Sequence, residues 1–355
     1  MTGPTQGGDC VIATRGDVTE NTHQVHAAIV DSNGRLLYSI GNPSRVTLMR
    51  SAAKPAQALA ILNTGCVETC GFDEADLALM CASHNSEQRH VDRARSMLRK
   101  AAVTEDHLEC GGHPSISNDV NRSWIKEDFE PTAINNNCSG KHAGMLAGTK
   151  ALGDDVDTYH LHDNSMQLEV KRVVEELTGL GSESVFWTTD GCNLPAPGVP
   201  LQNMAKLYAS FATAVDATNA NDQTARMSQI FHAMANHPEM VAGERRFCTA
   251  LMTAYKGKLI GKVGADGCYG VAIRASPKTR RLGADGAIGI AIKIEDGNLD
   301  VLYSVAVEIL KRLNMEEYGT ASKLLSYHHM ARWNTAGIKV GNHHHSYTLR
   351  PYNES

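Results

Sequence analysis

The chain has 355 residues, of which 42% are hydrophobic and 21% charged, close to the average for a globular protein. Its net charge is −5 and no basic cluster stands out, which argues against nucleic acid or an anionic membrane surface as the main partner. No run approaches the roughly 18 apolar residues of a membrane span, and residues 1–9 lack the apolar segment of a signal peptide. Nine cysteines at uneven spacings do not form a disulfide framework, so we expect a cytoplasmic protein in a reducing compartment.

Strands are predicted at both ends of the chain. Near the N-terminus they are expected at Cys10–Thr14, Gln24–Asp31 and Leu36–Ile40. The last two flank Asn33-Gly34, the strongest short hairpin signal. Late strands are expected at Leu259–Gly264, Tyr269–Ala275 and Ala287–Ile294, followed by a final helix at Leu299–Leu313.

The middle of the chain is predicted to be helical for about 200 residues from Ser51 onward. Apolar spacing, acidic first turns and Gly or Pro stops mark the helices. They are expected at 73–80, 87–102, 140–152, 163–180, 201–215 and 223–235.

Three short motifs in this order point to acyl-transfer chemistry. Ser51 and Lys54 form an S-x-x-K at the start of a helix, where residues three apart share one face. Ser83-His84-Asn85 is an S-x-N, and Lys262-Val263-Gly264 is a K-x-G on a predicted strand. Each motif is common alone, but all three in chain order are typical of the penicillin-recognising serine enzymes.

The arrangement of strands and motifs predicts an α/β (α+β) fold of the serine β-lactamase type. One antiparallel sheet would contain both the N- and C-terminal strands with flanking helices, and the K-x-G would lie on an edge strand facing the junction between lobes. We therefore predict a single catalytic domain, 1–355, of two lobes. These are a sheet lobe at about 9–50 plus 257–355 and a mostly helical lobe at about 51–256.

The motifs suggest a specific use of two lysines. A lysine with its ordinary pKa near 10.4 is protonated at pH 7, and burial or a second nearby cation is needed to make it a base. Our hypothesis is that Lys54 and Lys262 lower each other's pKa, that Ser51 attacks a carbonyl, and that Ser83 passes the proton or forms a second Ser–Lys pair. Backbone N–H groups near Ser51 and along the K-x-G strand would form the oxyanion hole.

A second cluster suggests a metal site. Cys138 lies just before a predicted helix that carries His142, and Cys192 follows far downstream in Asp190-Gly191-Cys192-Asn193. Thiols and imidazole suit zinc, although two separated cysteines are more often buried thiols. His343-His344-His345 near the C-terminus is interpreted as a solvated tail.

The chain resembles the rhizobial-type L-asparaginases, the class 3 or asparaginase II family, over nearly its whole length. The matching strings are Arg50-Ser51-Ala52-Ala53-Lys54-Pro55-Ala56-Gln57-Ala58, Cys81-Ala82-Ser83-His84, Asn137-Cys138-Ser139-Gly140-Lys141-His142-Ala143-Gly144-Met145-Leu146, Thr189-Asp190-Gly191-Cys192-Asn193-Leu194-Pro195 and Gly261-Lys262-Val263-Gly264-Ala265-Asp266. The resemblance implies hydrolysis of L-asparagine to L-aspartate and ammonia on a β-lactamase/glutaminase-like fold, usually in a homodimer.

The resemblance also implies roles for single residues. The family's Ser–Lys pairs fall on Ser51 with Lys54 and on Ser83 with Lys262, and its zinc ligands, completed by water, fall on Cys138, Lys141 and Cys192 in place of His142. Arg50 and Asp190 match positions near the substrate and suit the α-carboxylate and the α-ammonium of an amino acid. Contacts with the substrate are also expected from His84, Asn85 and Gly264, with the role of Asn85 the least secure because this stretch varies in the family.

Two rival functions remain at this point. The first keeps the chemistry and changes the substrate, giving a glutaminase, a peptidase or a β-lactamase. The second is a non-catalytic metal-binding protein with the same fold, which would not depend on Ser51 or Lys54 for activity.

Overall fold

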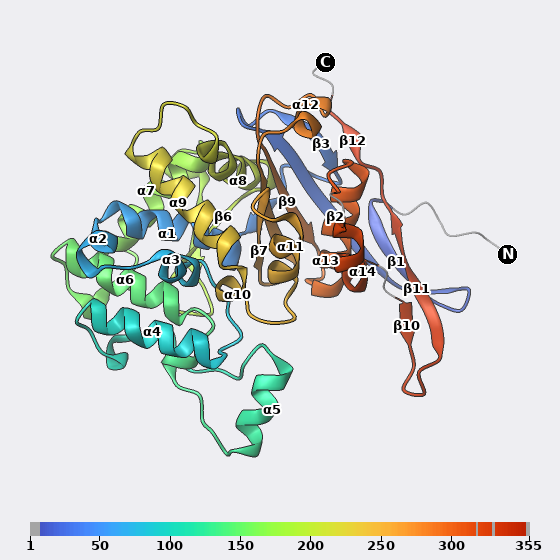
Figure 1. Cartoon of the computed structure of the whole chain (residues 1–355). Coiled ribbons are helices and arrows are strands. Elements are labelled where there is room, and N and C mark those ends of the chain that lie inside the picture. The colour runs from blue at the N-terminus through green and yellow to red at the C-terminus, as the bar shows by residue number, and fades with distance from the viewer. Residues whose placement is uncertain (1–7, 317–318, 329–330, 353–355) are drawn as a thin grey trace.

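The computed structural model describes residues 8–316, 319–328 and 331–352 and is built on an antiparallel sheet of nine strands (Figure 1). The main path of the sheet runs β10-β11-β1-β2-β9-β8-β7, and β3 and β12 are attached beside it. The strands are β1 (Cys10–Arg15), β2 (Val18–Asp31), β3 (Leu36–Ile40), β7 (Leu259–Gly264), β8 (Cys268–Ile273), β9 (Ile288–Ile294), β10 (Ala331–Trp333), β11 (Lys339–Ser346) and β12 (Arg350–Pro351). A small second sheet has the order β4-β6-β5, formed by β4 (Val46–Leu48), β5 (Phe186–Thr189) and β6 (Pro195–Pro200).

Strand β2 joins the two ends of the chain. It pairs with β1 and β3 from the N-terminal segment and with β9 from the C-terminal segment, in a register that sets Val25 opposite Ile294 and Asp31 opposite Ile288. The Asn33-Gly34 hairpin between β2 and β3 is confirmed, with Gly34 at φ +82°, a conformation that favours glycine. The predicted fold class, with one antiparallel sheet drawn from both ends of the chain, is therefore confirmed.

Helices fill the middle of the sequence and lie mostly to one side of the sheet (Figure 1). They are α1 (Lys54–Asn63), α2 (Cys66–Cys70), α3 (Glu74–Met80), α4 (Gln88–Lys100), α5 (Asn118–Lys126), α6 (Ser139–Ala151), α7 (Ser165–Thr178), α8 (Leu201–Val215), α9 (Asp222–Asn236), α10 (Pro238–Val241), α11 (Phe247–Tyr255), α12 (Pro277–Arg281), α13 (Leu299–Arg312) and α14 (Thr320–His328). The division into two lobes stays a prediction. The buried hydrophobic side chains of the described residues form one cluster. No helix in the described ranges is long and apolar enough to cross a lipid bilayer.

Helix α8 packs directly on the sheet because two glycines leave room for it. A Cβ added at Gly289 of β9 would lie 1.9 Å from the backbone oxygen of Ala205, and one at Gly270 of β8 would lie 2.0 Å from the Tyr208 ring. Strands β8 and β9 are buried along their whole length, since they pack against both α8 and α13. This explains why their sequences read as nearly continuous apolar runs.

Three expectations from the sequence are corrected here. The segment after Ser51 is not purely helical, because β5 and β6 interrupt it. The helix α13 is not the last element, since α14 and β10–β12 follow it. His343-His344-His345 is not a solvated tail: these residues lie in β11, paired with residues 11–13 of β1. The strand was not predicted because the sequence of β11 is polar and its pairing partner, β1, lies at the other end of the chain.

Candidate active site

The three predicted signatures meet where the edge strand β7 lies against the 3₁₀ turn η1 (Arg50–Ala53). Gly264 at the end of β7 allows this approach, because a Cβ there would lie 2.3 Å from the backbone oxygen of Met49 and 3.3 Å from the Ala52 nitrogen. The Tyr208 hydroxyl of α8 donates a hydrogen bond of 2.7 Å to the Ala52 oxygen, which fixes the turn to α8. Gly264 thus sets the spacing between the K-x-G strand and the S-x-x-K helix, and its predicted contact with a substrate stays a prediction.

Ser83 lies in an extended segment after α3 that is fixed on both sides by backbone hydrogen bonds. The Ser83 nitrogen donates to the Val241 oxygen (3.0 Å), and the His84 nitrogen donates to the Asn137 oxygen (3.1 Å). The guanidinium of Arg246 also reaches the Ser83 carbonyl, at 3.4 Å. Ser83 is therefore held rigidly although it belongs to no helix or strand.

The Ser83 hydroxyl lies between two buried amines. Its Oγ is 3.0 Å from Lys54 Nζ and 2.9 Å from Lys262 Nζ. Lys54 Nζ also contacts the Ala82 carbonyl, and Lys262 Nζ donates to the Val263 carbonyl at 2.7 Å. Both lysine side chains are essentially inaccessible, at 0% and 1% exposed, and within the described ranges neither forms a hydrogen bond with a carboxylate. The structure thus brings the lysines of both predicted pairs to the Ser83 oxygen, whereas no hydrogen bond joins Ser51 to its predicted partner Lys54 among the described residues.

This arrangement lowers the pKa of Lys262. Burial disfavours its ammonium and the positive charge of Lys54 adds to the effect, so that the pKa of Lys262 falls to about 7. An amine with such a pKa is neutral in a large fraction of molecules near pH 7 and can accept a hydroxyl proton.

Ser51 faces a cavity of about 340 Å³. It is half-buried, and among the described residues its hydroxyl makes no hydrogen bond with Lys54. The cavity is also lined by Arg50, Asp190, Cys138 and Cys192, so that predicted catalytic, substrate and metal residues share one space.

Arg50 and Asp190 form an ion pair at the cavity, with Arg50 Nε 2.6 Å from Asp190 Oδ1. Burial alone would raise the pKa of Asp190, but Lys141 and the hydrogen bond from Arg50 outweigh it and the pKa is lowered. Arg50 has φ +49°, a left-handed conformation that is costly for a residue with a side chain and often marks a functional position. The second carboxylate that contacts Arg50 is Asp266.

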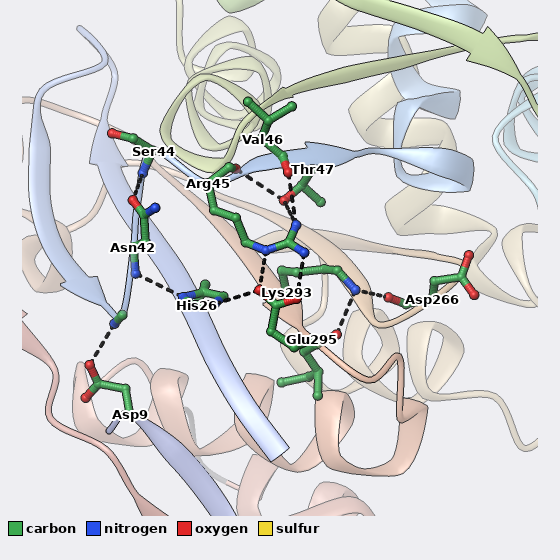
Figure 2. A network of polar contacts seen from close by, with 12 residues as sticks. Asp9, His26, Asn42, Ser44, Arg45, Val46, Thr47, Asp266, Lys293 and Glu295 are labelled. Atoms are coloured by element: carbon green, nitrogen blue, oxygen red, sulfur yellow. Dashed lines mark hydrogen bonds and ion pairs between the residues drawn. The ribbon is translucent and has the colours of Figure 1, made fainter. Parts of the chain in front are cut away.

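The loop that carries Asp266 is fastened to the sheet by Lys293 of β9. Lys293 Nζ donates to the carbonyls of Asp266 (2.5 Å) and Ile294 (2.7 Å), as Figure 2 shows. Next to it, Glu295 accepts hydrogen bonds from Arg45 and His26, which joins β2, β9 and the approach to β4 (Figure 2). This polar network holds the loop after the K-x-G strand and thereby the carboxylate that faces Arg50.

The predicted metal ligands converge at the N-terminus of α6. Lys141 Nζ is 3.1 Å from Cys192 Sγ, and Cys138 lies close enough to Cys192 for a hydrogen bond. That hydrogen bond, aided by the charges of Lys54 and Lys141 and opposed by burial, lowers the pKa of the Cys138 thiol well below its ordinary value. Two thiols, one predisposed to the thiolate, and an amine form a donor set that fits Zn²⁺. His142 is not part of this group of ligands, because its Nδ1 forms a hydrogen bond of 2.5 Å with the Tyr159 hydroxyl.

His84 and Asn85 are not part of the cavity lining. His84 Nδ1 accepts from the Ser86 nitrogen, so its Nε2 carries a proton and donates to Ser139 Oγ at 3.0 Å. Asn85 donates to Glu87 and to the Glu244 carbonyl and accepts from Arg246. In this structure both residues brace the segments around Ser83 and Cys138, and their predicted contact with a substrate stays a prediction.

Sequence reasoning assigned no role to three residues of this region. Asp266 stands two residues after the K-x-G signature and carries no motif of its own, and only the structure reveals its ion pair with Arg50. Arg246 holds both the Ser83 carbonyl and Asn85. His113 lines the cavity and accepts from the Asn137 nitrogen at 3.2 Å, but it belongs to a loop without any motif.

Comparisons with known proteins add a family and several distant structural relatives. The sequence matches the model of the L-asparaginase II family over residues 11–345. No curated protein matches it. Among solved structures, Mglu in its native form is similar with a TM-score of 0.43 and 11% identity, over 82% of this chain and 61% of that one. A probable glutaminase of Bacillus subtilis gives a TM-score of 0.34 and 12% identity, over 78% of this chain and 82% of that one. This chain thus spans about three fifths of the length of Mglu.

Proposed function

The chain belongs to the L-asparaginase II family, a family of amidohydrolases, and on that premise we propose that it hydrolyses L-asparagine to L-aspartate and ammonia by serine–lysine acyl transfer. The observation that carries the mechanism is the Ser83 hydroxyl shared by Lys54 and Lys262. The substrate, the mechanism and the metal are all part of this proposal.

The proposed nucleophile is Ser51, because it lines the cavity and lies in the turn η1 that leads directly into Lys54. The proton moves by a relay in which Lys54 receives the Ser51 proton as it gives one to the Ser83 oxygen, and Ser83 gives its own proton to Lys262, whose pKa of about 7 makes it the final acceptor. Ser83 is the alternative nucleophile, since its hydroxyl already contacts both amines. A stable acyl-enzyme in Ser51→Ala, seen by burst kinetics and mass spectrometry of the quenched protein, would identify Ser83 as the nucleophile.

The proposed reaction has two steps, acylation of the serine and hydrolysis of the acyl-enzyme. The serine oxygen forms a bond with the side-chain amide carbon, the C–N bond breaks, and the amide nitrogen leaves as ammonia with the proton held by the lysines. Water then attacks the aspartyl ester, the lysines accept its proton, and L-aspartate leaves while the serine recovers its hydrogen. Backbone N–H groups near Ser51 and on β7 are proposed to stabilise the oxyanion in both steps.

The pair of Arg50 and Asp190 is proposed to recognise the amino-acid end of the substrate. A guanidinium binds the α-carboxylate and a carboxylate binds the α-ammonium. The two groups are 2.6 Å apart here and would separate to admit the zwitterion. Asp266 would then keep Arg50 in place from the other side.

Zinc is proposed to bind Cys138, Lys141 and Cys192, with water completing its shell. When bound, it would supply a fixed positive charge that helps to position the substrate. Lys141 must lose its proton to bind, although negative charge on Cys192, Cys138 and Asp190 outweighs burial and raises its pKa. Metal analysis of Lys141→Met against wild type tests the assignment independently of activity. Equal zinc content in both proteins would refute it.

The function is tested by comparing substrates. Ammonia release should be fastest with L-asparagine, slower with L-glutamine, and a chromogenic β-lactam should not be hydrolysed. Faster release from glutamine, or turnover of the β-lactam alone, would favour the first rival. No turnover of any substrate, in a folded protein with zinc bound, would favour the non-catalytic rival. The predicted homodimer and cytoplasmic location remain predictions.

A further inference from the structure

A second cluster of metal-ligating side chains lies among the C-terminal elements, outside the lining of the cavity that Ser51 faces. It consists of Glu308 on α13, His328 at the end of α14 and His345 on β11. Their ligand atoms all lie within 4.8 Å of one another, and among the described residues no other three His, Cys, Asp or Glu side chains come together in this way. Glu308 Oε2 is 2.6 Å from His328 Nε2, and the rings of His328 and His345 stack at 5.7 Å with an interplanar angle of 13°.

Hydrogen bonds from neighbouring groups orient the side chains of Glu308 and His345 and hold the backbone at His328. Arg312 Nε donates to the second oxygen of Glu308 at 2.7 Å. The Ser304 hydroxyl is 2.9 Å from His345 Nε2 and also 2.9 Å from the backbone oxygen of His328. Supporting hydrogen bonds of this kind orient the ligands of protein metal sites and strengthen their binding.

The cluster opens on a cavity of about 400 Å³. Because side chains alternate along a strand, His343 lies on the same side of β11 as His345 and lines this cavity, whereas His344 points to the other side and is exposed. The cavity offers room for water or one further ligand at the open side of a bound ion.

Two imidazoles and one carboxylate form a ligand set for divalent transition metals, with zinc the commonest. Bonds of about 2.0–2.2 Å place ligand atoms roughly 3–3.5 Å apart around such an ion. Because the three ligand atoms already lie within 4.8 Å of one another, a bound ion requires only small side-chain shifts, including a slight opening of the 2.6 Å Glu308–His328 hydrogen bond. An ion would replace the hydrogen bond between Glu308 and His328.

We propose that Glu308, His328 and His345 bind a divalent transition metal of the zinc class, at a site separate from Cys138, Lys141 and Cys192. The ion ties α14 and β11 to α13. Since β11 pairs with β1, the metal also connects α13 and α14 to the N-terminal strands of the sheet.

Zinc binding to the full-length chain tests this proposal. The background is Cys138→Ser/Cys192→Ser, which removes the thiol ligands and leaves the C-terminal cluster intact. We expect one equivalent of Zn²⁺ to bind in calorimetry and to raise the melting temperature. His345→Ala in this background should weaken binding at least about tenfold and abolish the thermal shift. His344→Ala, on the opposite side of the same strand, should change neither.

Two outcomes would overturn the proposal: no zinc binding by the cysteine double variant, or equal binding by the His344 and His345 variants. If the double variant does not fold, metal content is measured in the wild-type background instead. His345→Ala should then lose one equivalent that His344→Ala retains, and identical metal content in both would overturn the proposal.

Discussion

The proposed activity should depend on pH through the protonation of the buried Lys262 amine. Its pKa of about 7, lowered by burial and by Lys54, means that the neutral base forms as the pH rises through 7. We predict that kcat/KM for L-asparagine rises between pH 6 and 8 with an inflection near 7. Lys262→Arg, which stays protonated, should lose at least about a hundredfold in rate. Lys258→Arg, an exposed lysine just before β7, serves as the control and should keep the wild-type profile.

The same amine makes stability depend on pH. The pKa of Lys262 is lower in the folded chain than in the unfolded one, so the unfolded state binds more protons between about pH 7 and 10.4 and stability rises with pH across that window. Below pH 7 the folded protein bears the full cost of the buried charge, on the order of 4 kcal/mol. Lys262→Met should therefore raise the free energy of unfolding at pH 6 by more than at pH 9, as measured in urea. An equal effect at both pH values would contradict this.

At the scale of elements, the contact between β7 and η1 positions Ser51 and Lys54 against Lys262. In Gly264→Ala the added Cβ would lie 2.3 Å from the Met49 carbonyl oxygen, so that η1 would have to move away from β7. We predict a loss of activity of at least about a hundredfold, with a smaller loss of stability, about 1–3 kcal/mol.

Gly181→Ala is the matched control for that variant, because an added Cβ there meets no atom within 4 Å. It should leave both activity and unfolding unchanged. Wild-type activity in Gly264→Ala would show that the close approach of β7 to η1 is not needed for catalysis.

The site was predictable from the sequence where its parts are local, and not where they depend on distant pairing. The spacing of Ser51 and Lys54 is a property of one helical turn, and the K-x-G strand follows from its own β-rich run. The sequence could not show that the Ser83 oxygen accepts hydrogen bonds from both amines. This contact requires β7, α1 and the segment after α3 to meet in space. Asp266 and His113 were missed for the same reason, since neither is marked by a local pattern.

At the scale of the whole molecule, the two ends of the chain stabilise each other through the sheet. Strand β11 was missed because its Lys339–Ser346 sequence is mostly polar and half-exposed, while its pairing partner β1 is more than 300 residues away. Gly341 of β11 fits tightly there, since an added Cβ would lie 1.8 Å from the Thr14 carbonyl.

Gly341→Ala should therefore lower the free energy of unfolding by about 1–3 kcal/mol, measured by urea denaturation. Ser346→Ala, at an exposed position of the same strand, is the control and should have almost no effect. Unchanged stability in Gly341→Ala would mean that β11 does not contribute to the stability of the fold.

The most direct test of the shared hydroxyl is the rate of ammonia release from L-asparagine by Ser83→Ala. Removing the one oxygen that joins Lys54 to Lys262 should reduce kcat/KM by about 10²–10⁴-fold while the protein remains folded. A rate within a few-fold of wild type would show that these amines serve another purpose and that the proposed centre is wrong.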